Sequence, residues 1–572
     1  MIPPQPTRTV GKLLEPIQIG RVRARNRVLM TPMTTRFADA DGSVTGQLIA
    51  HYEARARGGT GTIIVELSSP HPSGAHRRRE VGIHSDRYIG GLSRLAERVH
   101  RHGALVGIQI GHAGAHARPD VTGYPAVAPS STPHTVHETD IRKVRPRPLA
   151  KDEIEECVGW YAEAAARVVR AGFDLVEIQG GHDYLIKQFL SPLDNTRQDE
   201  FGGDLEGRAR FGLAVVAAVR SAIGSTPISF RYSVDEFARG GFSRDDGVKL
   251  APMLCAAGCD LISVSGGSAN ATLTPSTNTT PMAYPPGLFV PLAEEVRRRV
   301  TVPVAVANRI HDPVYGNDVI AAGKADMIGL GRALLADPDW VLKVEAGQLD
   351  RIRPCLACNT CTDHLKYGRP IRCVVNPSLG RDAELALRPA REPRTVAIVG
   401  AGPAGMAAAL RAAERGHRVV LLEEAKDIGG RLLQIPRAPY FQSVRTAAEP
   451  FERLVAYFRT SILDDGVEVR TAVPATSAVV QELRPDVVVL AEGARYPVPG
   501  LLRLLDVPGL RALAGIQRFR KVFFKLLRPR PTTLIDELEQ LGIATRTAGD
   551  RSGSRGVEAA ILSGTQTADG IE

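Results

Sequence analysis

The stretch FDLVEIQ, residues 173–179, is a short apolar run that ends on a polar side chain, which is typical of a buried strand. Seven similar runs recur in the first two-thirds of the chain, with helical patterns between them: RVLMTPM (27–33), GTIIVEL (61–67), ALVGIQI (104–110), PISFRYS (227–233), DLISVS (260–265), VPVAVAN (302–308) and ADMIGLG (325–331). Eight strands alternating with helices predict an α/β fold, a (β/α)8 TIM barrel over residues 1–345. Its active site should lie at the C-terminal strand ends.

The composition is that of a large globular protein. With 572 residues, of which 43% are hydrophobic, the chain can bury more than one core. The net charge of +10 is carried largely by scattered arginines without a nucleic-acid-binding motif, so no nucleic-acid partner is expected. The start of the chain shows no apolar signal region, and no uninterrupted apolar run of roughly 18 residues suggests a membrane span. We therefore expect a cytoplasmic protein.

Side chains that can bind a ligand are concentrated where the expected strands end. They are Met33 and Thr34, Glu66, Gln109, Gln179, Arg231, Ser265, Asn308 with Arg309, and Gly331 with Arg332. Arginine and amide groups crowded at one rim indicate an anionic ligand that forms hydrogen bonds. The last two strand ends stand where barrels commonly bind a phosphate. The alternative is that Arg332 is an ordinary arginine after a turn.

Four segments together resemble the flavin barrels of the Old Yellow Enzyme family: NRVLMTPMTTRF, VGIQIGHAG, DLVEIQGGHDYLIKQFLSPLDNTRQDEFGGDLEGRARF and GLGRALLADP. The resemblance covers roughly residues 11–345 and implies an FMN-dependent oxidoreductase. It places Pro32, Met33, Thr34 and Gln109 against the flavin ring, and Arg309, Gly331 and Arg332 at the phosphate. Arg231 would lie near the pyrimidine edge, where a cation stabilises the anionic reduced flavin.

The segment after residue 178 holds the candidate catalytic side chains Gln179, His182 and Tyr184. In the ene-reductases that it resembles, the first two positions bind the substrate carbonyl as an oxyanion hole, and the tyrosine protonates the alpha carbon. A tyrosine hydroxyl, whose ordinary pKa is about 10, is protonated at neutral pH and can act as a general acid. Gln179 stands where such families usually carry histidine, so we expect weaker polarisation of a simple enone. The alternative for Tyr184 is packing at the rim.

Four of the seven cysteines, Cys355, Cys358, Cys361 and Cys373, have the spacing C-x2-C-x2-C-x11-C. The overlapping triplet favours an iron–sulfur cluster, and zinc is the alternative, although zinc ligands usually come as separate C-x2-C pairs. The 2,4-dienoyl-CoA reductase and trimethylamine dehydrogenase branch carries a [4Fe-4S] cluster at the same place in the chain. The resemblance thus implies an electron path between two nucleotide cofactors, over a cluster segment and linker at residues 346–390. The other three cysteines are expected to be core thiols.

Residues 391–572 begin with a dinucleotide-binding pattern. RTVAIVGAGPAGMAAALRAAERGHRVVLLEEAKDIGGRL turns through Gly400, Gly402 and Gly405 and returns in a strand ending at Glu423, which could hold a ribose hydroxyl. Asp550 resembles the second motif of flavoproteins with two dinucleotide domains, and Arg431 is a further candidate cofactor ligand. We therefore predict a Rossmann-like FAD-binding domain. The interval of about 500–545 is too short for a complete second NAD(P)H-binding unit and includes the basic stretch RFRKVFFKLLRPRP.

Three functions remain open from the sequence. The first is reduction of an activated C=C bond, of the 2,4-dienoyl-CoA or enone type, with hydride from FMN, a proton from Tyr184, and electrons from NAD(P)H or a protein donor. The alternative is an amine or other substrate dehydrogenase that passes electrons out through the cluster and FAD to a partner carrier. Its aromatic cage has little support, because the chain has only two tryptophans. The third is a flavin-binding electron-transfer subunit without turnover of its own; oligomers are compatible with all three.

Overall fold

A computed structural model describes residues 10–138, 140–268, 278–442, 444–493, 534–552 and 556–572. The chain divides into two compact units. Unit 1 comprises Met1–Glu384 and Pro439–Pro450, and unit 2 comprises Leu385–Ala438 and Phe451–Glu572. None of the helices in the described ranges is both long and apolar enough to cross a membrane.

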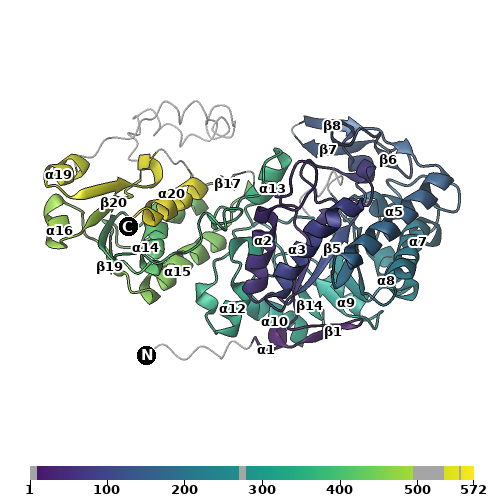
Figure 1. Ribbon diagram of the computed structural model, residues 1–572, viewed down its shortest axis with the longest axis horizontal. Coiled ribbons are helices and arrows are strands. Elements are labelled where there is room, and N and C mark those ends of the chain that lie inside the picture. The colour runs from purple at the N-terminus through teal and green to yellow at the C-terminus, as the bar shows by residue number, and fades with distance from the viewer. Residues whose placement is uncertain (1–9, 139, 269–277, 443, 494–533, 553–555) are drawn as a thin grey trace. The chain divides into compact units, whose positions relative to one another are not determined.

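Unit 1 is built on a closed barrel of eight parallel strands (Figure 1). Each strand pairs with the next one along the chain, and β14 closes the barrel by pairing with β3. The strands are β3 (Val28–Met30), β4 (Thr62–Ser68), β5 (Leu105–Ile110), β10 (Leu175–Gly180), β11 (Ile228–Ser233), β12 (Leu261–Ser265), β13 (Val304–Val306) and β14 (Met327–Leu330). All eight coincide with the apolar runs of the sequence, so the predicted barrel is confirmed.

An apolar layer closes one end of the barrel. Leu175, Leu261 and Met327, each the first residue of its strand, belong to one buried cluster. The hairpin of β1 (Ile17–Ile19) and β2 (Val22–Ala24) adds Ile17 and Ile19 to this cluster. The hairpin therefore seals the N-terminal ends of the strands and leaves the C-terminal ends for a ligand, as in other barrels of this type.

Helices connect the strands and cover the barrel (Figure 1). The helices of unit 1 up to the cysteine segment are α1 (Gly11–Leu14), α2 (Gly46–Arg57), α3 (Ile89–His100), α4 (Pro119–Thr122), α5 (Lys151–Arg170), α6 (Leu185–Leu190), α7 (Leu205–Ile223), α8 (Arg244–Ala257), α9 (Val290–Arg297), α10 (Pro313–Ala321), α11 (Arg332–Ala336) and α12 (Trp340–Glu345). Side-chain caps start several of them: Thr45 accepts from Leu48 N–H in α2, and Asp204 accepts from Gly207 N–H in α7. Such caps satisfy backbone N–H groups that the first helical turn leaves without partners.

The cysteine segment packs on the barrel within unit 1. It includes α13 (Thr360–Lys366), whose first turn contains Cys361. After this helix, the backbone N–H of Ile371 donates to Thr35 O at 3.0 Å. The amide of Asn376 donates to Leu335 O at 2.8 Å, so the segment is fastened both after β3 and at α11.

Unit 2 contains a parallel sheet of five strands in the order β19-β16-β15-β20-β21. Its elements are β15 (Thr395–Val399), α14 (Pro403–Glu414), β16 (Arg418–Leu422), α15 (Glu449–Asp464), β19 (Glu468–Arg470), α16 (Ser477–Glu482), β20 (Val487–Leu490), α19 (Leu534–Gln540), β21 (Ala544–Thr547) and α20 (Val557–Asp569). Strand, glycine turn, helix and strand follow in the predicted order, so the Rossmann-like fold is confirmed. Most of the predicted shortened interval, including the basic stretch at 518–531, lies outside the described residues.

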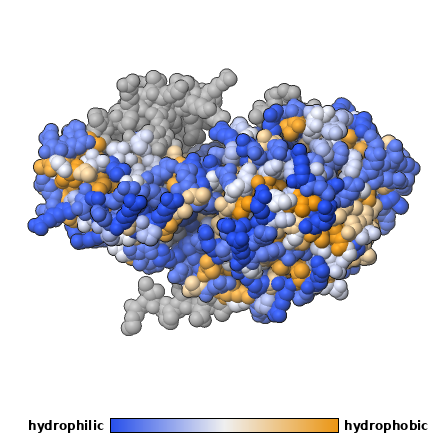
Figure 2. All heavy atoms as spheres, in the orientation of Figure 1, coloured by the Kyte–Doolittle hydropathy of each residue, from blue (hydrophilic) through white to orange (hydrophobic). Residues whose placement is uncertain are grey.

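Hydrophilic side chains cover most of the face shown in Figure 2, and hydrophobic residues gather there only in smaller patches. Large apolar side chains that are exposed include Tyr124, Tyr367 and Tyr440, which lie far apart in the sequence. Exposed apolar residues scattered singly are normal for a globular protein.

Candidate active site

A cavity of about 540 Å³ lies at the C-terminal strand ends of the barrel. Its lining includes side chains or backbone from five of these ends: Met33, Arg231, Ser265, Asn308 and Gly331. The volume lies within the roughly 300–1,000 Å³ that ligand and cofactor pockets occupy. The cavity lies at the end of the barrel where the sequence predicts the active site, opposite the apolar seal.

The cavity is lined by positive charge. Five cationic side chains line it: Arg77, Arg231, Arg309, Arg332 and Lys366. No aspartate or glutamate is among the described residues of the lining. Forked arginine donors without competing carboxylates favour a ligand that carries phosphate or carboxylate groups.

Arg231 is held in place by side chains of the neighbouring strand. Its guanidinium donates to the Ser263 hydroxyl at 2.9 Å and to the Ser265 hydroxyl at 3.5 Å. Glu177 faces Arg231 from β10 and accepts a hydrogen bond from Gln109 at 2.9 Å. Burial raises the pKa of Glu177, and the charge of Arg231 opposes this increase. Arg231 is thus a preorganised cation at the mouth of the barrel, and its place near a flavin pyrimidine edge stays a prediction.

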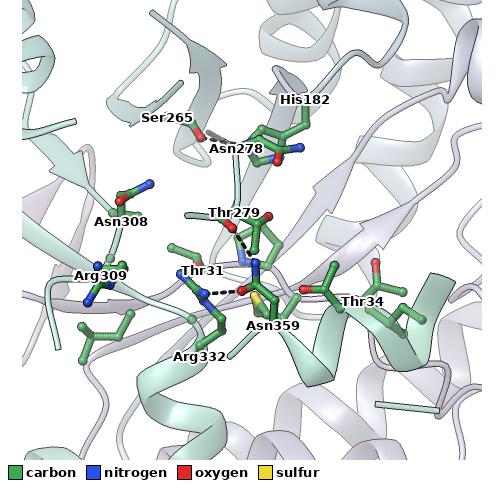
Figure 3. A pocket seen from close by; sticks show the side chains of 18 of the residues that line it. Thr31, Thr34, His182, Ser265, Asn278, Thr279, Asn308, Arg309, Arg332 and Asn359 are labelled. Atoms are coloured by element: carbon green, nitrogen blue, oxygen red, sulfur yellow. Dashed lines mark hydrogen bonds between the residues drawn. The ribbon is translucent and has the colours of Figure 1, made fainter. Parts of the chain in front are cut away.

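The opposite part of the cavity is suited to a phosphate. Arg332 lies there beside Asn359, at the start of α13 (Figure 3). Arg332 and Arg309 donate to the backbone oxygens of the consecutive residues Thr280 and Pro281. Arg332 donates to the Asn359 amide oxygen at 2.5 Å, and Asn359 donates to Thr279 O at 2.8 Å. A Cβ atom at Gly331 would lie 2.8 Å from Thr31 Oγ1 and 2.9 Å from Met33 Sδ, which explains why glycine stands there. The volume and positive charge of the cavity, and the space left by the missing side chain of Gly331, fit FMN.

Asn308 and Arg309 adopt left-handed backbone conformations, with φ values of 101° and 55°. Such conformations are costly for residues other than glycine and are often found at functional sites. They follow β13 directly and direct both residues to the cavity.

The three predicted catalytic residues do not all reach the cavity. Tyr184 and His182 line it, and Nε2 of His182 lies 2.7 Å from the Ser265 hydroxyl (Figure 3). Gln179 is not among the described lining residues, and its amide faces inward to Gln109 at 3.5 Å. Its oxygen accepts from the N–H of Gly181 at 3.1 Å. The structure therefore does not support Gln179 as a donor to a substrate carbonyl, because both ends of its amide face other protein groups.

His182 is a neutral group in this site. Burial and the charge of Arg231 lower its pKa to about 3. A neutral imidazole carries one N–H and one acceptor nitrogen. When the Ser265 hydroxyl donates to Nε2, the N–H is on Nδ1 and can bind a substrate oxygen.

Several residues of the site were not found from the sequence. His76, Arg77 and His116 line the cavity, with His76 next to Tyr184, and Asn359 lines it next to Arg332. His76 and Arg77 come from the loop after β4, which carries no family motif. The sequence signal for these residues is the high density of basic and imidazole side chains in HPSGAHRRRE (71–80). The same composition is equally typical of a loop that faces solvent.

The predicted cluster ligands adjoin the same cavity. Cys355 lines it, and Cys358 and Cys361 are buried close by. Burial raises the pKa of the Cys373 thiol, and the charges of the other three thiols raise it further, which places all four near one another. Among the described residues, no group of three or more His, Cys, Asp or Glu side chains is arranged to hold a metal ion. The [4Fe-4S] cluster, with zinc as the alternative, therefore stays a prediction for these four thiols.

In unit 2, three glycines leave space for a nucleotide at the start of α14. Gly400 has φ +97°, and a Cβ at Gly405 would lie 1.8 Å from Gly400 O. A Cβ at Gly402 would meet no atom within 4 Å, so the helix start is open to a ligand. These contacts fit a pyrophosphate approaching α14.

The two ends of the predicted FAD fold meet in the structure. The Arg431 guanidinium lies 3.6 Å from an Asp550 carboxylate oxygen, and a Cβ at Gly549 would lie 2.9 Å from Ala404 in α14. Glu423 accepts from the backbone N–H groups of Ala401 and Ala425, at 2.7 and 2.9 Å. Its carboxylate therefore supports the glycine turn, and its contact with a ribose stays a prediction.

The sequence comparisons agree with this geometry. Residues 12–351 match the NADH:flavin oxidoreductase / NADH oxidase family, and residues 398–462 match an NAD(P)-binding Rossmann-like domain. The chain belongs to the NADH:flavin oxidoreductase / NADH oxidase family. As a member of this family it is an FMN-dependent oxidoreductase, and the predicted resemblance is confirmed.

Several members of the family are similar over both units. The chain is 39% identical to an NADH oxidase of Thermoanaerobacter brockii, over 84% of this chain and 73% of the relative. It is 35% identical to an N,N-dimethylglycine/sarcosine dehydrogenase of Chromohalobacter salexigens, over 84% and 69%. It is 34% identical to a cinnamate reductase of Clostridium sporogenes, over 84% and 75%. The fold is that of a solved 2-naphthoyl-CoA reductase complex, with a TM-score of 0.87, 23% identity, and coverage of 99% and 100%.

Replacing Arg332 by alanine should weaken FMN binding. A hydrogen bond to a charged group contributes roughly 1.5–3 kcal/mol, so the dissociation constant should rise about 10- to 100-fold. Equilibrium dialysis or fluorescence titration of apoprotein with FMN measures the change. Arg332→Lys should recover only part of the affinity, because ammonium lacks the forked geometry. Arg299→Ala, an exposed arginine after α9, should bind FMN as the parent does, and equal affinity in all three variants would contradict this role.

Proposed function

We propose that the protein reduces an activated C=C bond of a 2,4-dienoyl-CoA or enone-type substrate. The observation that carries the proposal is that Tyr184 and His182 both line the cavity. Five cationic side chains line the same cavity, and its described residues include no carboxylate. An electron-poor alkene carries a carbonyl or carboxylate that such a lining can hold. The similarity to a cinnamate reductase supports the same class of substrate.

The roles of the residues follow from their chemistry. The N–H of His182 would bind the carbonyl oxygen, where negative charge develops as the alkene is reduced. The Tyr184 hydroxyl would give its proton to the alpha carbon. Arg77 or His116, which also line the cavity, would take over the second carbonyl contact that Gln179 does not make.

Pro32, Met33, Thr34, Arg231, Arg309, Gly331 and Arg332 line the cavity in which FMN would bind. Gln109, predicted to lie against the flavin ring, is not among the described lining residues and donates to Glu177. When bound, FMN supplies the hydride for the beta carbon. Cys355, Cys358, Cys361 and Cys373 would hold a [4Fe-4S] cluster, which supplies one-electron transfer. Gly400, Gly402, Gly405, Glu423, Arg431 and Asp550 would bind FAD, and NAD(P)H or an electron-transfer protein would provide the electrons. A cytoplasmic location and an oligomeric state remain predictions.

The alternative is oxidation of an amine, as the name of the N,N-dimethylglycine/sarcosine dehydrogenase indicates for that relative. The cavity favours it less, because Arg77 and Lys366, the two cationic lining residues that are not assigned to FMN, would repel a substrate ammonium. Neither tryptophan is among the described lining residues: Trp160 stacks on His71 at 4.0 Å, and Trp340 is buried and donates to His311 O. The aromatic cage expected of an amine site is thus not supported.

Anaerobic half-reactions separate the two functions. Protein reduced with dithionite is mixed with cinnamate, 2-cyclohexenone or a 2,4-dienoyl-CoA, and oxidised protein is mixed with dimethylglycine. We expect at least one alkene to restore the oxidised flavin spectrum and to yield the saturated product by mass spectrometry. Flavin reduction by the amine together with no reaction of any alkene would overturn the proposal.

A further inference from the structure

Tyr184 stands at one end of a row of three hydrogen-bonded titratable side chains. Its hydroxyl lies 3.1 Å from Nε2 of His76, and Nδ1 of His76 lies 2.7 Å from Oε2 of Glu80. The rings of Tyr184 and His76 meet edge to face, with centroids 5.2 Å apart. Tyr184 follows β10, whereas the other two residues follow β4, so only the closed barrel brings the row together.

The row leads from the cavity into the protein. Tyr184 and His76 line the cavity, whereas Glu80 is not among its described lining residues. The side chains of His76 and Glu80 are each only 7% exposed. The backbone N–H of His76 also donates to Oε2 of Glu80 at 3.3 Å, which fixes the carboxyl group relative to the ring.

The surroundings of Glu80 favour its protonated form. Burial raises the pKa of this carboxyl to about 8, against the opposing effects of the His76 and Ser69 backbone and of Arg77 and Arg36. Glu66 on β4 is a titratable neighbour of Glu80, and burial raises its pKa to about 8 as well; His116 is a titratable neighbour of His76. With these groups included, Glu80 retains a proton at pH 7 next to a histidine that can pass it on.

We propose that His76 and Glu80 form a proton relay to Tyr184, which replaces the proton that Tyr184 gives to the alpha carbon of the substrate. The inference deepens the proposed function and rests on it, since the relay has a purpose only if Tyr184 is the acid. His76 exchanges a proton with the catalytic hydroxyl, and Glu80 acts through His76.

One proton moves along each link of the row. The O–H bond of Tyr184 breaks as a C–H bond forms at the alpha carbon. The Nε2–H proton of His76 moves to the tyrosine oxygen, and the carboxyl proton of Glu80 moves to Nδ1. Each broken bond leaves its electron pair on the atom that lost the proton, so the negative charge finishes on Glu80 rather than on Tyr184. Between turnovers water in the cavity gives a proton to Nε2 of His76, and the Nδ1 proton returns to Glu80, which restores the starting state of all three groups.

A purely structural role for Glu80 would consist of holding the loop after β4. Glu80→Gln separates the two roles, because glutamine has the same shape and still forms hydrogen bonds but has no transferable proton. If the relay operates, this variant slows the oxidation of reduced flavin by alkene about 10- to 100-fold, which is no more than the 10²–10⁴ that a direct general acid contributes. The reductive half-reaction stays unchanged.

The pH profile gives a readout that a structural role would not move. The row works while Glu80 carries its proton, so the parent rate should be constant at low pH and fall as the pH rises through about 8. In Glu80→Gln this decrease should disappear, leaving a lower and flatter profile. The proton inventory in mixed H2O and D2O should be curved in the parent, because several protons move, and closer to linear in the variant.

Glu53 provides a matched control. Its carboxylate lies 3.3 Å from Nε2 of His102, so it forms a second Glu–His pair, and neither residue is among the described lining of the cavity. Glu53→Gln should leave the rate and its pH profile as in the parent. A Glu80→Gln profile identical to the parent, with a slow Tyr184→Phe variant, would refute the relay but keep the proposed function. A Tyr184→Phe variant as fast as the parent would refute both.

An equilibrium measurement, without substrate turnover, tests directly whether Glu80 carries the proton. Infrared difference spectra of the oxidised protein between pH 6 and pH 9 should contain a carboxylic-acid band that is lost at the higher pH. The band should lose the part due to Glu80 in Glu80→Gln and stay complete in Glu53→Gln; the remaining part comes from Glu66, whose pKa burial also raises to about 8. Retention of the full band in Glu80→Gln would show that the proton is held elsewhere and would overturn the relay.

Discussion

Replacing Tyr184 by phenylalanine should slow the oxidation of reduced flavin by an electron-poor alkene by roughly 10²–10⁴, the range that a positioned general acid contributes. The hydroxyl lines the cavity and is held at 3.1 Å from His76, whereas phenylalanine keeps the ring and has no proton to give. The proton would then have to come from water that reaches the site without orientation. Stopped-flow absorbance of the flavin under anaerobic conditions measures the rate constant.

The effect should be confined to this half-reaction. Reduction of the flavin by dithionite or NAD(P)H should proceed in Tyr184→Phe as in the parent, because no proton is delivered to an alkene in that step. Tyr124→Phe changes an exposed tyrosine of the loop after α4 and serves as the matched control. Equal alkene rates in Tyr184→Phe and Tyr124→Phe would falsify the assignment of Tyr184 as the acid.

Cys361→Ala should remove the iron–sulfur cluster. The side chain comes from the first turn of α13, close to the other three thiols, and a cubane that loses one of four protein ligands is poorly retained. We expect the iron content of anaerobically purified protein to fall from about four atoms per chain to near zero. Iron and acid-labile sulfide assays, together with the visible absorbance, measure the loss.

The consequences for the flavin follow from the position of the cysteine loop. Asn359 lies between Cys358 and Cys361 and accepts a hydrogen bond from Arg332, so a loosened loop should also reduce FMN retention. Cys255→Ala, a partly exposed thiol of α8, should keep both iron and FMN. Zinc with no iron or sulfide in the anaerobically purified parent protein would support the alternative metal and contradict the cluster.

The barrel and the Rossmann-like unit could be predicted because each strand is visible in the sequence. A strand of a parallel sheet is buried on both faces, and all six residues of β10 are indeed buried. The glycine positions of unit 2 were equally visible, since the turn at Gly400 and the close approach at Gly405 leave no room for a side chain. Local pattern therefore predicted the elements, their order and the edge at which ligands bind.

Gln179 shows where this reasoning stops. Its place at a strand end was predicted correctly, but a side chain at such a position can face the cavity or the barrel interior. Glu177, from the same strand, and Gln109, from the neighbouring strand β5, form a polar row into which the Gln179 amide fits. No pattern within one strand contains the hydrogen-bond partners of the next.

The chain order of residues thus specifies which segments become strands, glycine turns and cysteine loops, because burial and backbone conformation act locally along the chain. The neighbours of Tyr184, in contrast, are decided by the tertiary structure. His76 and Glu80 lie more than 100 residues before it in the chain and come close to it only because β4 and β10 end at the same rim of the barrel. Arg332 and Asn359 likewise join two parts of the cavity through a single hydrogen bond. Proton and charge transfer depend on distances of a few ångströms between such segments, and those distances arise only when the barrel closes.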